Sequence, residues 1–408
     1  MKALIILPAF TRGGFEASLI RLYEYLEDYG LDPEVVETSS FQPRQECSFP
    51  KSVIGVASDP YVWRICKLYN YLSNLSNCLI FNFSDDVLQG CLPKACSNKN
   101  VIVQVLRNDH PSVYKSTITL PAFWDFVITN SPVIYSNLQK KVPTKDIRFI
   151  PNGYSIPGHR GHRECPRTDA NIVNILFVGR LVNESKGIFL IPLILRYLQS
   201  KGLKVHLTIV GDGPDKKSLV DQISQSELCG FVTFVEWQSP LSLSRLFYRA
   251  DYLLLLSYYE GLPNVVIEAL AHGCIPIMKR LNCLTSYLSD NSNSGLEFNI
   301  DNLQPLSDYI QNLETNIHLK AETKARCISY YHQNFSRSIE KARYNNLVKS
   351  CVSRGPKTPR YNLLVCEFLG IKLPVIAYLF VISRQLSVFP LYLKTFALAV
   401  YRSARGIA

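Results

Sequence analysis

Short apolar runs alternate with amphipathic segments, and this alternation constrains the fold more than any other feature of the chain. In the second half, runs typical of β-strands lie at residues 174–178, 205–210, 232–235, 252–257 and 276–279. Segments with helical spacing of apolar residues lie between them, at 190–198, 217–226, 241–249 and 264–272. Strands that alternate with helices form right-handed βαβ units with parallel strands. We therefore predict a doubly wound α/β sheet here.

The beginning of the chain shows the same order. An apolar run at 3–7 is followed by a glycine turn at Gly13 and Gly14 and by a helical period that ends near Gly30. Further strand-like runs lie at 33–37, 78–83, 101–106, 126–129 and 148–150. Residues 154–171 are rich in glycine, proline and basic residues and show no apolar period, which is typical of a linker. We predict an α/β protein with two Rossmann-like doubly wound domains, 1–153 and 172–335, facing across a cleft.

Composition and charge narrow the classes of function. The chain has 408 residues, 47% hydrophobic and 19% charged, which excludes a disordered polyelectrolyte. Of its formal net charge of +11, residues 354–408 carry +7, from eight basic residues and one acidic residue. The other 353 residues carry +4, so we predict no nucleic-acid partner. No C-x-x-C occurs among the twelve cysteines, and no signal peptide precedes the first run, so we expect no metal site and a cytoplasmic location.

Two glutamates flank the predicted start of the helix at 264–272. A strand ends near Ser257, a glycine turn follows, and the free backbone N–H groups of Gly261 and Leu262 offer an anion site at the helix N-terminus. Glu260 lies just before this helix and Glu268 about one turn into it. Carboxylates accept hydrogen bonds from pairs of sugar hydroxyls. The alternative is a glutamate that complements the helix dipole, together with a solvated one.

A basic loop follows the strand at 174–178. Arg180 and Lys186 lie in it, and an arginine fork with a nearby lysine is suited to a diphosphate. The segment from Gly211 to Pro214 closes the next strand as a tight turn. It does not match G-x-G-x-x-G, so it does not indicate a nicotinamide cofactor.

These motifs occur in an order that resembles the family 4 retaining glycosyltransferases of GT-B fold, over about residues 3–340. The residues that carry the resemblance are Gly13-Gly14, Pro151-Asn152-Gly153, Gly179-Arg180 with Lys186-Gly187, Gly211–Pro214, and Glu260 with Glu268. The resemblance implies an acceptor-side domain at 1–153, a nucleotide-sugar-binding domain at 172–335 and a helix at 336–353 that packs back across both. After residue 235, where the family commonly has glycine, this chain has Glu236-Trp237, next to the expected nucleotide base.

Site roles also follow from the resemblance. Arg180 and Lys186 would neutralise the donor diphosphate, and Glu268 would hold the ribose hydroxyls. Gly13 and Gly14 would approach the donor phosphate from across the cleft. The residues expected beside the transferred sugar are the catalytic pair Glu260 and His110, with the amides of Gly261 and Leu262.

The expected chemistry is retaining transfer of hexosyltransferase type. Breaking the bond between sugar and diphosphate builds positive charge on the anomeric carbon and negative charge on the leaving phosphate. Cations and helix N-termini aimed at that phosphate stabilise the transition state. We therefore expect no cofactor and no metal, with the nucleotide-sugar as co-substrate, and Glu260 as a positioning group rather than a nucleophile.

The basic C-terminal segment, 354–408, is expected to contact a membrane. Its longest uncharged run, 373–383, is shorter than the ~20 residues that span a bilayer. On an ideal helix, five of its basic residues fall within an arc of about 120°. This pattern is typical of helices that lie on an anionic surface. The alternative is a terminal helical pair that covers an apolar patch.

Three functions remain open from sequence alone. The first is a glycosyltransferase at the inner face of the membrane, acting on a glycan or lipid-linked glycan in the synthesis of cell-surface polysaccharide or glycoconjugates. The second is a nucleotide-sugar epimerase of the same fold. The third is a non-catalytic scaffold that binds membrane or nucleic acid. The sequence does not identify the sugar, the nucleotide base or the acceptor.

Overall fold

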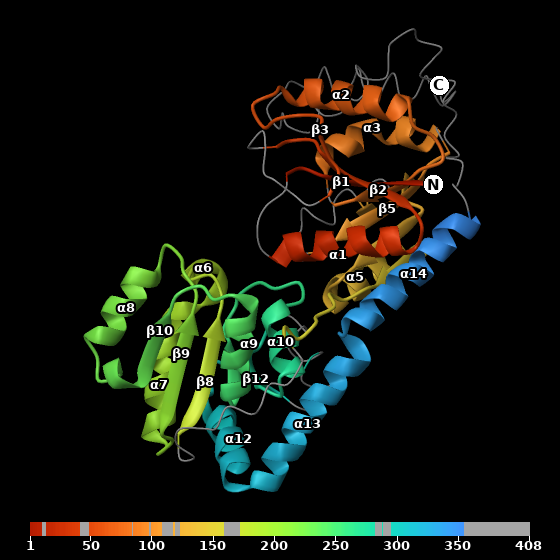
Figure 1. Ribbon diagram of the computed structural model, residues 1–408. Coiled ribbons are helices and arrows are strands. Elements are labelled where there is room, and N and C mark those ends of the chain that lie inside the picture. Colours follow the sequence, from red (N-terminus) through yellow and green to blue (C-terminus); the bar gives the residue numbers. More distant parts are fainter. Residues whose placement is uncertain are drawn as a thin grey trace, which may run out of the picture.

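The computed structural model describes residues 1–9, 14–40, 49–83, 85–97, 99–107, 117–118, 123–158, 172–281, 288 and 295–354. They form two parallel sheets with helices on both faces, joined along one side by two long helices (Figure 1). The predicted fold class is confirmed. Within these ranges no helix combines the length and apolarity needed to cross a membrane. Apart from Arg354, the basic C-terminal segment lies outside the described residues.

The N-terminal unit contains a seven-stranded sheet in the order β3-β2-β1-β4-β5-β6-β7, with every neighbouring pair parallel. Its strands are β1 (Lys2–Leu7), β2 (Asp32–Glu37), β3 (Lys51–Val53), β4 (Leu79–Asn82), β5 (Val101–Leu106), β6 (Phe126–Thr129) and β7 (Asp146–Phe149). Its helices are α1 (Gly14–Asp28), α2 (Tyr61–Ser73), α3 (Asp86–Ser97) and α5 (Pro132–Lys141). The short edge strand β3 was not predicted, because its three residues show no apolar alternation.

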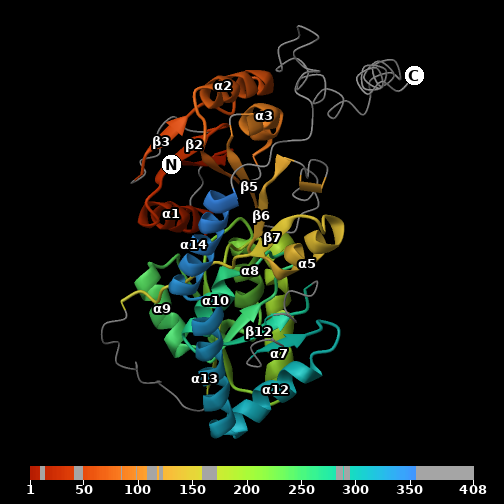
Figure 2. The ribbon, with the colours of Figure 1, turned by 90° about the vertical axis from the view of Figure 1, so that its right-hand side faces the viewer.

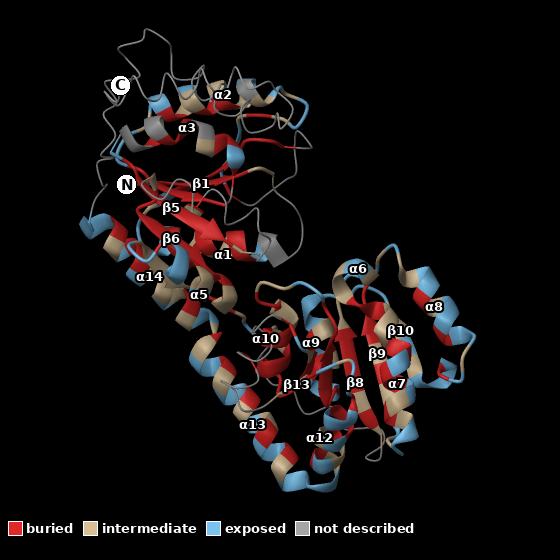
Figure 3. Ribbon diagram, turned by 180° about the vertical axis from the view of Figure 1, so that it is seen from behind, coloured by how far each residue is buried: buried red, intermediate tan, exposed pale blue. Residues whose placement is uncertain are grey.

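Successive residues of β1 point to opposite faces of this sheet, so the run of apolar residues contributes to two cores. Ala3, Ile5 and Leu7 pack in one cluster with residues of α1. Leu4 and Ile6 join the other cluster, with residues of α2 and α3. This period of two explains why β1 is apolar throughout, as in parallel sheets covered on both faces (Figure 3).

The C-terminal unit contains a six-stranded parallel sheet in the order β10-β9-β8-β11-β12-β13. Its strands are β8 (Val173–Val178), β9 (Val205–Val210), β10 (Val232–Val235), β11 (Tyr252–Leu255), β12 (Ile275–Lys279) and β13 (Leu296–Phe298). Its helices are α6 (Asn183–Lys186), α7 (Ile191–Ser200), α8 (Lys216–Ser224), α9 (Pro240–Arg249), α10 (Asn264–Ala271), α12 (Gln304–Thr315) and α13 (Ile317–Asn334), with short 3-10 turns at Ile188–Leu190 and Cys229–Phe231.

The last helix returns to the N-terminal unit. α13 packs against α10, and α14 (Arg337–Arg354) packs against α1 on the other unit, as Figures 1 and 2 both show. Tyr344, Leu347, Val348 and Cys351 of α14 are part of the N-terminal core. Helix α14, although last in sequence, is therefore structurally part of the N-terminal unit.

Candidate functional site

Three loops of the C-terminal unit meet where β8, β9 and β11 end. Because these strands are parallel neighbours or next neighbours, the loops that follow them lie at the same edge of the sheet. The amide of Leu181 donates to the carbonyl of Asp212 over 2.8 Å, and the amide of Tyr258 donates to the carbonyl of Ser185 over 2.9 Å. The loop after β8 is thus hydrogen-bonded to both of the others.

Glycines permit this close packing of loops. A Cβ at Gly211, where φ is +147°, would lie 2.0 Å from the carbonyl oxygen of Gly179. One at Gly213 would lie 2.3 Å from the carbonyl oxygen of Leu181. At Gly187 φ is +62°, and a Cβ would lie 2.5 Å from the carbonyl oxygen of Leu256. The segment Gly211–Pro214 is therefore a tight turn whose glycines let the loop after β8 pack against it.

Lys186 and Glu260 form an ion pair. Nζ of Lys186, at the end of α6, lies 2.5 Å from Oε1 of Glu260, and the hydroxyl of Ser257 donates to the same oxygen over 2.7 Å. Both groups were predicted as site residues from separate motifs. Their direct contact was missed, because no local signal relates residues 74 positions apart. The hydrogen bond from Ser257, three residues before Glu260, was also not predicted. Only the adjacency of β8 and β11 brings Lys186 and Glu260 together.

Arg180 lies at the same edge of the sheet, directly after β8 and Gly179. Its side chain is exposed, and its guanidinium group makes no ion pair with any residue the structure describes. A cation that the fold places at a loop junction without a partner can bind an anion from solution.

The segment before α10 leaves two backbone donors open. Pro263 is the N-cap residue of α10 and makes no side-chain cap hydrogen bond. Among the described residues, the N–H groups of Gly261 and Leu262 have no hydrogen-bond partner. The side chain of Leu262 is buried and anchors this segment to the core. The N-terminus of α10 therefore presents free donors and the positive end of a helix dipole.

Glu268 lies inside α10, one turn beyond these donors. Burial raises the pKa of its carboxyl group to about 7. Within the described part of the chain no hydrogen bond reaches this carboxyl group. A carboxyl group that has lost much of its water without gaining a donor favours its neutral form, and ligand hydroxyls that donate to it would reverse this preference.

The side chains of Tyr258 and Lys279, close to this edge, were not predicted as site residues. Tyr258 lies beside Gly187, and Nζ of Lys279, at the end of β12, lies 4.2 Å from the centre of its ring. Burial lowers the pKa of Lys279. Trp237, which follows β10, exposes 66% of its surface, and its neighbour Glu236 is paired with Lys216. A cation and exposed aromatic rings thus flank the loops described above.

The N-terminal unit contributes less to the described site. Gly14 is the first residue of α1, which follows the carboxyl end of β1. Gly13 and His110 lie outside the described residues. Within the ranges that are described, no three His, Cys, Asp or Glu side chains gather in a group that could hold a metal ion.

Comparisons with known proteins agree with this arrangement. Residues 166–333 match the family model described as glycosyl transferases group 1. A putative glycosyltransferase, EpsF, of Bacillus subtilis is 22% identical over 305 residues, which cover 67% of this chain and 77% of that protein. LpsE of Rhizobium meliloti, a lipopolysaccharide core biosynthesis glycosyltransferase, is 26% identical over 55% of this chain and 64% of its own length. The structure of Anabaena HepE in complex with UDP superposes with a TM-score of 0.68 at 18% identity, covering 86% of this chain and 100% of that one.

Proposed function

We propose that this chain transfers a hexosyl group from a nucleotide-sugar to a glycan or lipid-linked glycan with retention of configuration. Its residues 166–333 match the group 1 glycosyltransferases, and this match confirms the family resemblance stated from the sequence. One observation carries the proposal. The Lys186–Glu260 pair, the open amides of Gly261 and Leu262, and the unpartnered Glu268 carboxyl group belong to one edge of one sheet.

The basic groups are proposed to bind the diphosphate. Lys186 has three N–H donors, so it can hold Glu260 and a phosphate oxygen at once. Arg180 offers a fork of donors from the preceding loop. As the sugar–phosphate bond breaks, negative charge grows on the leaving diphosphate, and these fixed cations stabilise it more than they stabilise the intact donor. We propose that this charge stabilisation makes a metal ion or other cofactor unnecessary.

The carboxylates are proposed to bind hydroxyl groups. Glu260, held by Ser257 and Lys186, is oriented to accept hydrogen bonds from the transferred sugar. Glu268 is oriented to accept from the ribose, whose hydroxyls would supply the donors its carboxyl group lacks. The predicted roles of Gly13 and Gly14 at the phosphate and of His110 at the sugar remain part of this proposal.

The acceptor is inferred from the names of two relatives, and the location from the charge of the C-terminal segment. LpsE is named for lipopolysaccharide core biosynthesis, and TuaC of Bacillus subtilis, 34% identical over 32% of this chain, for teichuronic acid biosynthesis. Such names favour an acceptor in cell-surface polysaccharide or glycoconjugate synthesis. The basic segment 354–408 is proposed to hold the enzyme against the anionic inner face of the membrane.

Two measurements on the purified full-length chain test this proposal. A thermal-shift screen of nucleoside diphosphates and nucleotide-sugars identifies the donor, because a ligand of the native state raises Tm by mass action. Incubation of the donor with glycan acceptors then follows sugar transfer and the anomeric configuration of the product. Release of an epimerised donor without acceptor would indicate an epimerase instead, and the absence of any nucleotide binding would refute both activities.

A further inference from the structure

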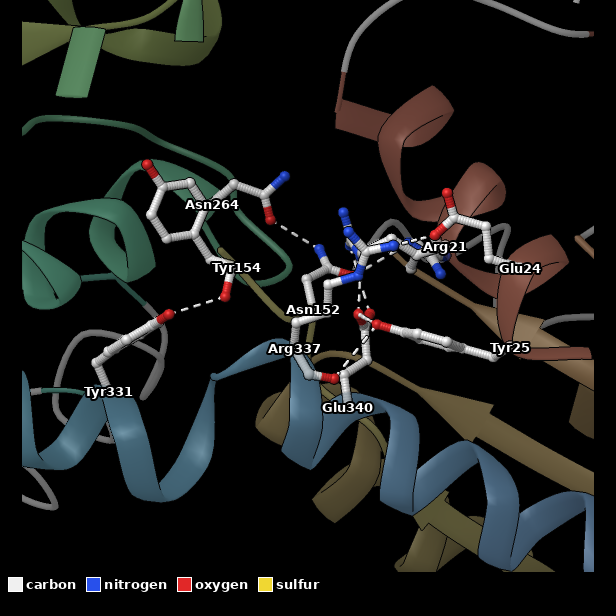
Figure 4. Close-up of polar contacts among 10 residues, drawn as sticks. Arg21, Glu24, Tyr25, Asn152, Tyr154, Asn264, Tyr331, Arg337 and Glu340 are labelled. Carbon is white, nitrogen blue, oxygen red and sulfur yellow. Dashed lines mark hydrogen bonds and ion pairs between the residues drawn. The ribbon is translucent and has the colours of Figure 1, made fainter. Parts of the chain in front are cut away.

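The chain crosses between the two units twice, and the two crossings are bonded to each other. The amide of Tyr154 donates to the carbonyl of Phe335 over 2.9 Å, and the amide of Arg337 donates to the carbonyl of Tyr154 over 3.2 Å. The hydroxyl of Tyr331 donates to the same carbonyl over 2.8 Å. Figure 4 shows this junction beside the first turn of α14. Any change in the angle between the units must therefore involve both crossings.

Gly153 allows α14 to approach the first crossing closely. A Cβ at this position would lie 2.7 Å from Oε2 of Glu340 and 3.0 Å from Cα of Arg337. Glu340 is in turn held by the N-terminal unit, because Nε of Arg21 donates to Oε2 over 2.7 Å and the hydroxyl of Tyr25 donates to it over 2.9 Å. Glu340, which lies against Gly153, is therefore hydrogen-bonded to α1 of the N-terminal unit (Figure 4).

Asn152, which precedes Gly153, forms side-chain hydrogen bonds with residues of both the N-terminal and the C-terminal unit. Nη1 of Arg107, directly after β5, donates to Oδ1 of Asn152 over 3.1 Å. Nδ2 of Asn152 donates to Oδ1 of Asn264 over 2.7 Å, and Asn264 is the first residue of α10 (Figure 4). A guanidinium group only donates hydrogen bonds, so the carbonyl oxygen of Asn152 must face Arg107 and its NH2 group must face Asn264.

Arg107 is well suited to set this orientation. Its guanidinium group lies 5.2 Å from the centre of the Phe83 ring. Burial lowers the pKa of Arg107, while Tyr344 and Glu340 act in the opposite direction. Asn152 is itself only 6% exposed, so loss of either partner would leave a buried amide group unpaired.

We infer that Asn152 is a positioning residue that sets α10 and its N-terminal donors in place relative to the N-terminal unit. Its hydrogen bond to Asn264 holds the first residue of α10. The segment just before this helix contains Glu260, Gly261 and Leu262. The effect of Asn152 on turnover rests on the proposed transferase function, whereas its effect on the arrangement of the two units does not.

A cycle of aspartate substitutions tests this inference. In Asn264→Asp, the NH2 group of Asn152 still donates to the new carboxylate. In Asn152→Asp, the carboxylate accepts from Arg107, and it also accepts from the NH2 group of Asn264 once that side-chain amide has flipped by 180°. In the double variant two carboxylates face each other and the bond is lost. We expect each single variant to keep kcat within about threefold, and the double variant to fall at least about tenfold below the product of the two.

The arrangement of the units is measured independently of activity. Nitroxide labels on non-natural amino acids at the exposed positions Trp63, on α2, and Gln225, after α8, report the distance between units by pulsed electron paramagnetic resonance. We expect a broader distance distribution in the double variant than in the wild type or either single variant. The double variant Asn70→Asp/Asn74→Asp, at exposed positions on and just after α2, adds the same charge away from the junction and should match the wild type.

Each outcome supports or overturns the inference. Single effects on kcat that simply multiply, or an unchanged distance distribution in the double variant, would overturn it. A chain that lacks transferase activity but shows the expected distance changes would keep the inference and remove the proposed function. If the double variant fails to fold, Asn264→Leu replaces it, because that position is partly exposed and Asn152 keeps Arg107. Wild-type kcat in folded Asn264→Leu would then refute the role.

Discussion

Nζ of Lys186 lies 2.5 Å from Oε1 of Glu260, although 74 residues separate the two in sequence. The pair joins the loop after β8 to the loop after β11. Each group would otherwise be a charge at the sheet edge with its own solvent shell. Their contact means that a variant of either residue changes the electrostatic surroundings of the other.

The role of Lys186 in binding predicts a large loss of affinity on its removal. Lys186→Met removes a charged donor from the proposed diphosphate site, and such bonds contribute about 1.5–3 kcal/mol. We expect the Kd for UDP, measured by isothermal titration calorimetry, to rise roughly 10- to 100-fold. Lys201→Met, at an exposed turn after α7, is the control and should bind like the wild type. Equal affinity in Lys186→Met would remove this residue from the proposed site.

The raised pKa of Glu268 predicts a pH dependence of stability. Its pKa is about 7 in the folded chain, above the ordinary value of 4.5, so the folded state binds more protons than the unfolded state between these values. Its contribution is fully present below pH 4.5 and is lost as pH rises through 7. We expect the unfolding free energy of the wild type to fall relative to Glu268→Gln by about 1–3 kcal/mol between pH 5 and 8. Parallel curves from denaturant titrations would contradict this, and the exposed Glu227→Gln serves as control.

The same carboxyl group predicts a pH dependence of binding. Ribose hydroxyls donate to the carboxylate form, so binding should favour loss of the proton. We expect UDP affinity in the wild type to increase through pH 7 more steeply than in Glu268→Gln. The comparison at each pH removes the titration of the nucleotide itself. Identical pH profiles for the two proteins would show that Glu268 does not hold the nucleotide.

The hydrogen bonds of Glu340 to α1 predict a large contribution of this residue to the free energy of unfolding. Glu340 is 3% exposed and accepts hydrogen bonds from Arg21 and Tyr25. Glu340→Ala removes the ion-pair partner of the partly buried Arg21 and leaves the buried Tyr25 hydroxyl only its longer bond of 3.4 Å to the carbonyl of Arg337. We expect a loss of about 3–5 kcal/mol in the free energy of unfolding by urea. Lys341→Ala breaks the neighbouring pair with Asp28, which joins the same two helices at the surface, and should cost less than about 1 kcal/mol. Similar losses in both variants would contradict the proposed difference.

The glycine turn after β9 predicts a steric effect without any loss of charge. Gly213→Ala would place a Cβ 2.3 Å from the carbonyl oxygen of Leu181 and push the loop after β8 outward. We expect a loss of about 2 kcal/mol or more in stability, and weaker UDP binding, because Arg180 lies in the displaced loop. Gly230→Ala has no atom within 4 Å of the new Cβ and should leave binding unchanged. A Gly213→Ala protein that binds UDP normally would show that this loop does not position the site.

The basic C-terminal segment, nearly all of which lies outside the described residues, predicts electrostatic membrane binding. The triple variant Lys372→Glu/Arg384→Glu/Lys394→Glu reverses three charges of that segment. Each basic residue near an anionic surface contributes about 1 kcal/mol, so we expect affinity for phosphatidylserine vesicles to fall by more than about 100-fold. Vesicles of neutral lipid are the control. Salt-independent binding that the triple variant retains would favour an apolar contact instead.

Much of the fold was predictable because it depends on local spacing. The continuous apolar run of β1 and the helical spacing of Leu19, Leu22 and Leu26 are visible without any tertiary information. The strands β3 and β13 were missed because each is three residues long and pairs at a sheet edge, where neighbouring strands rather than its own apolar pattern define it. The boundaries 1–153, 172–335 and 336–353 stay predictions, as does the role of His110.

Two parallel α/β units and the residue types of the candidate site follow from the amino-acid sequence, because apolar period, glycine turns and charged loops are local properties. Which of these residues come into contact depends on the tertiary structure. Lys186 contacts Glu260 because β8 and β11 are neighbours, and Asn152 reaches Asn264 because two crossings of the chain bring the first unit to the start of α10. Such contacts depend on the order of strands and the path of the chain, and no spacing within a single motif encodes them.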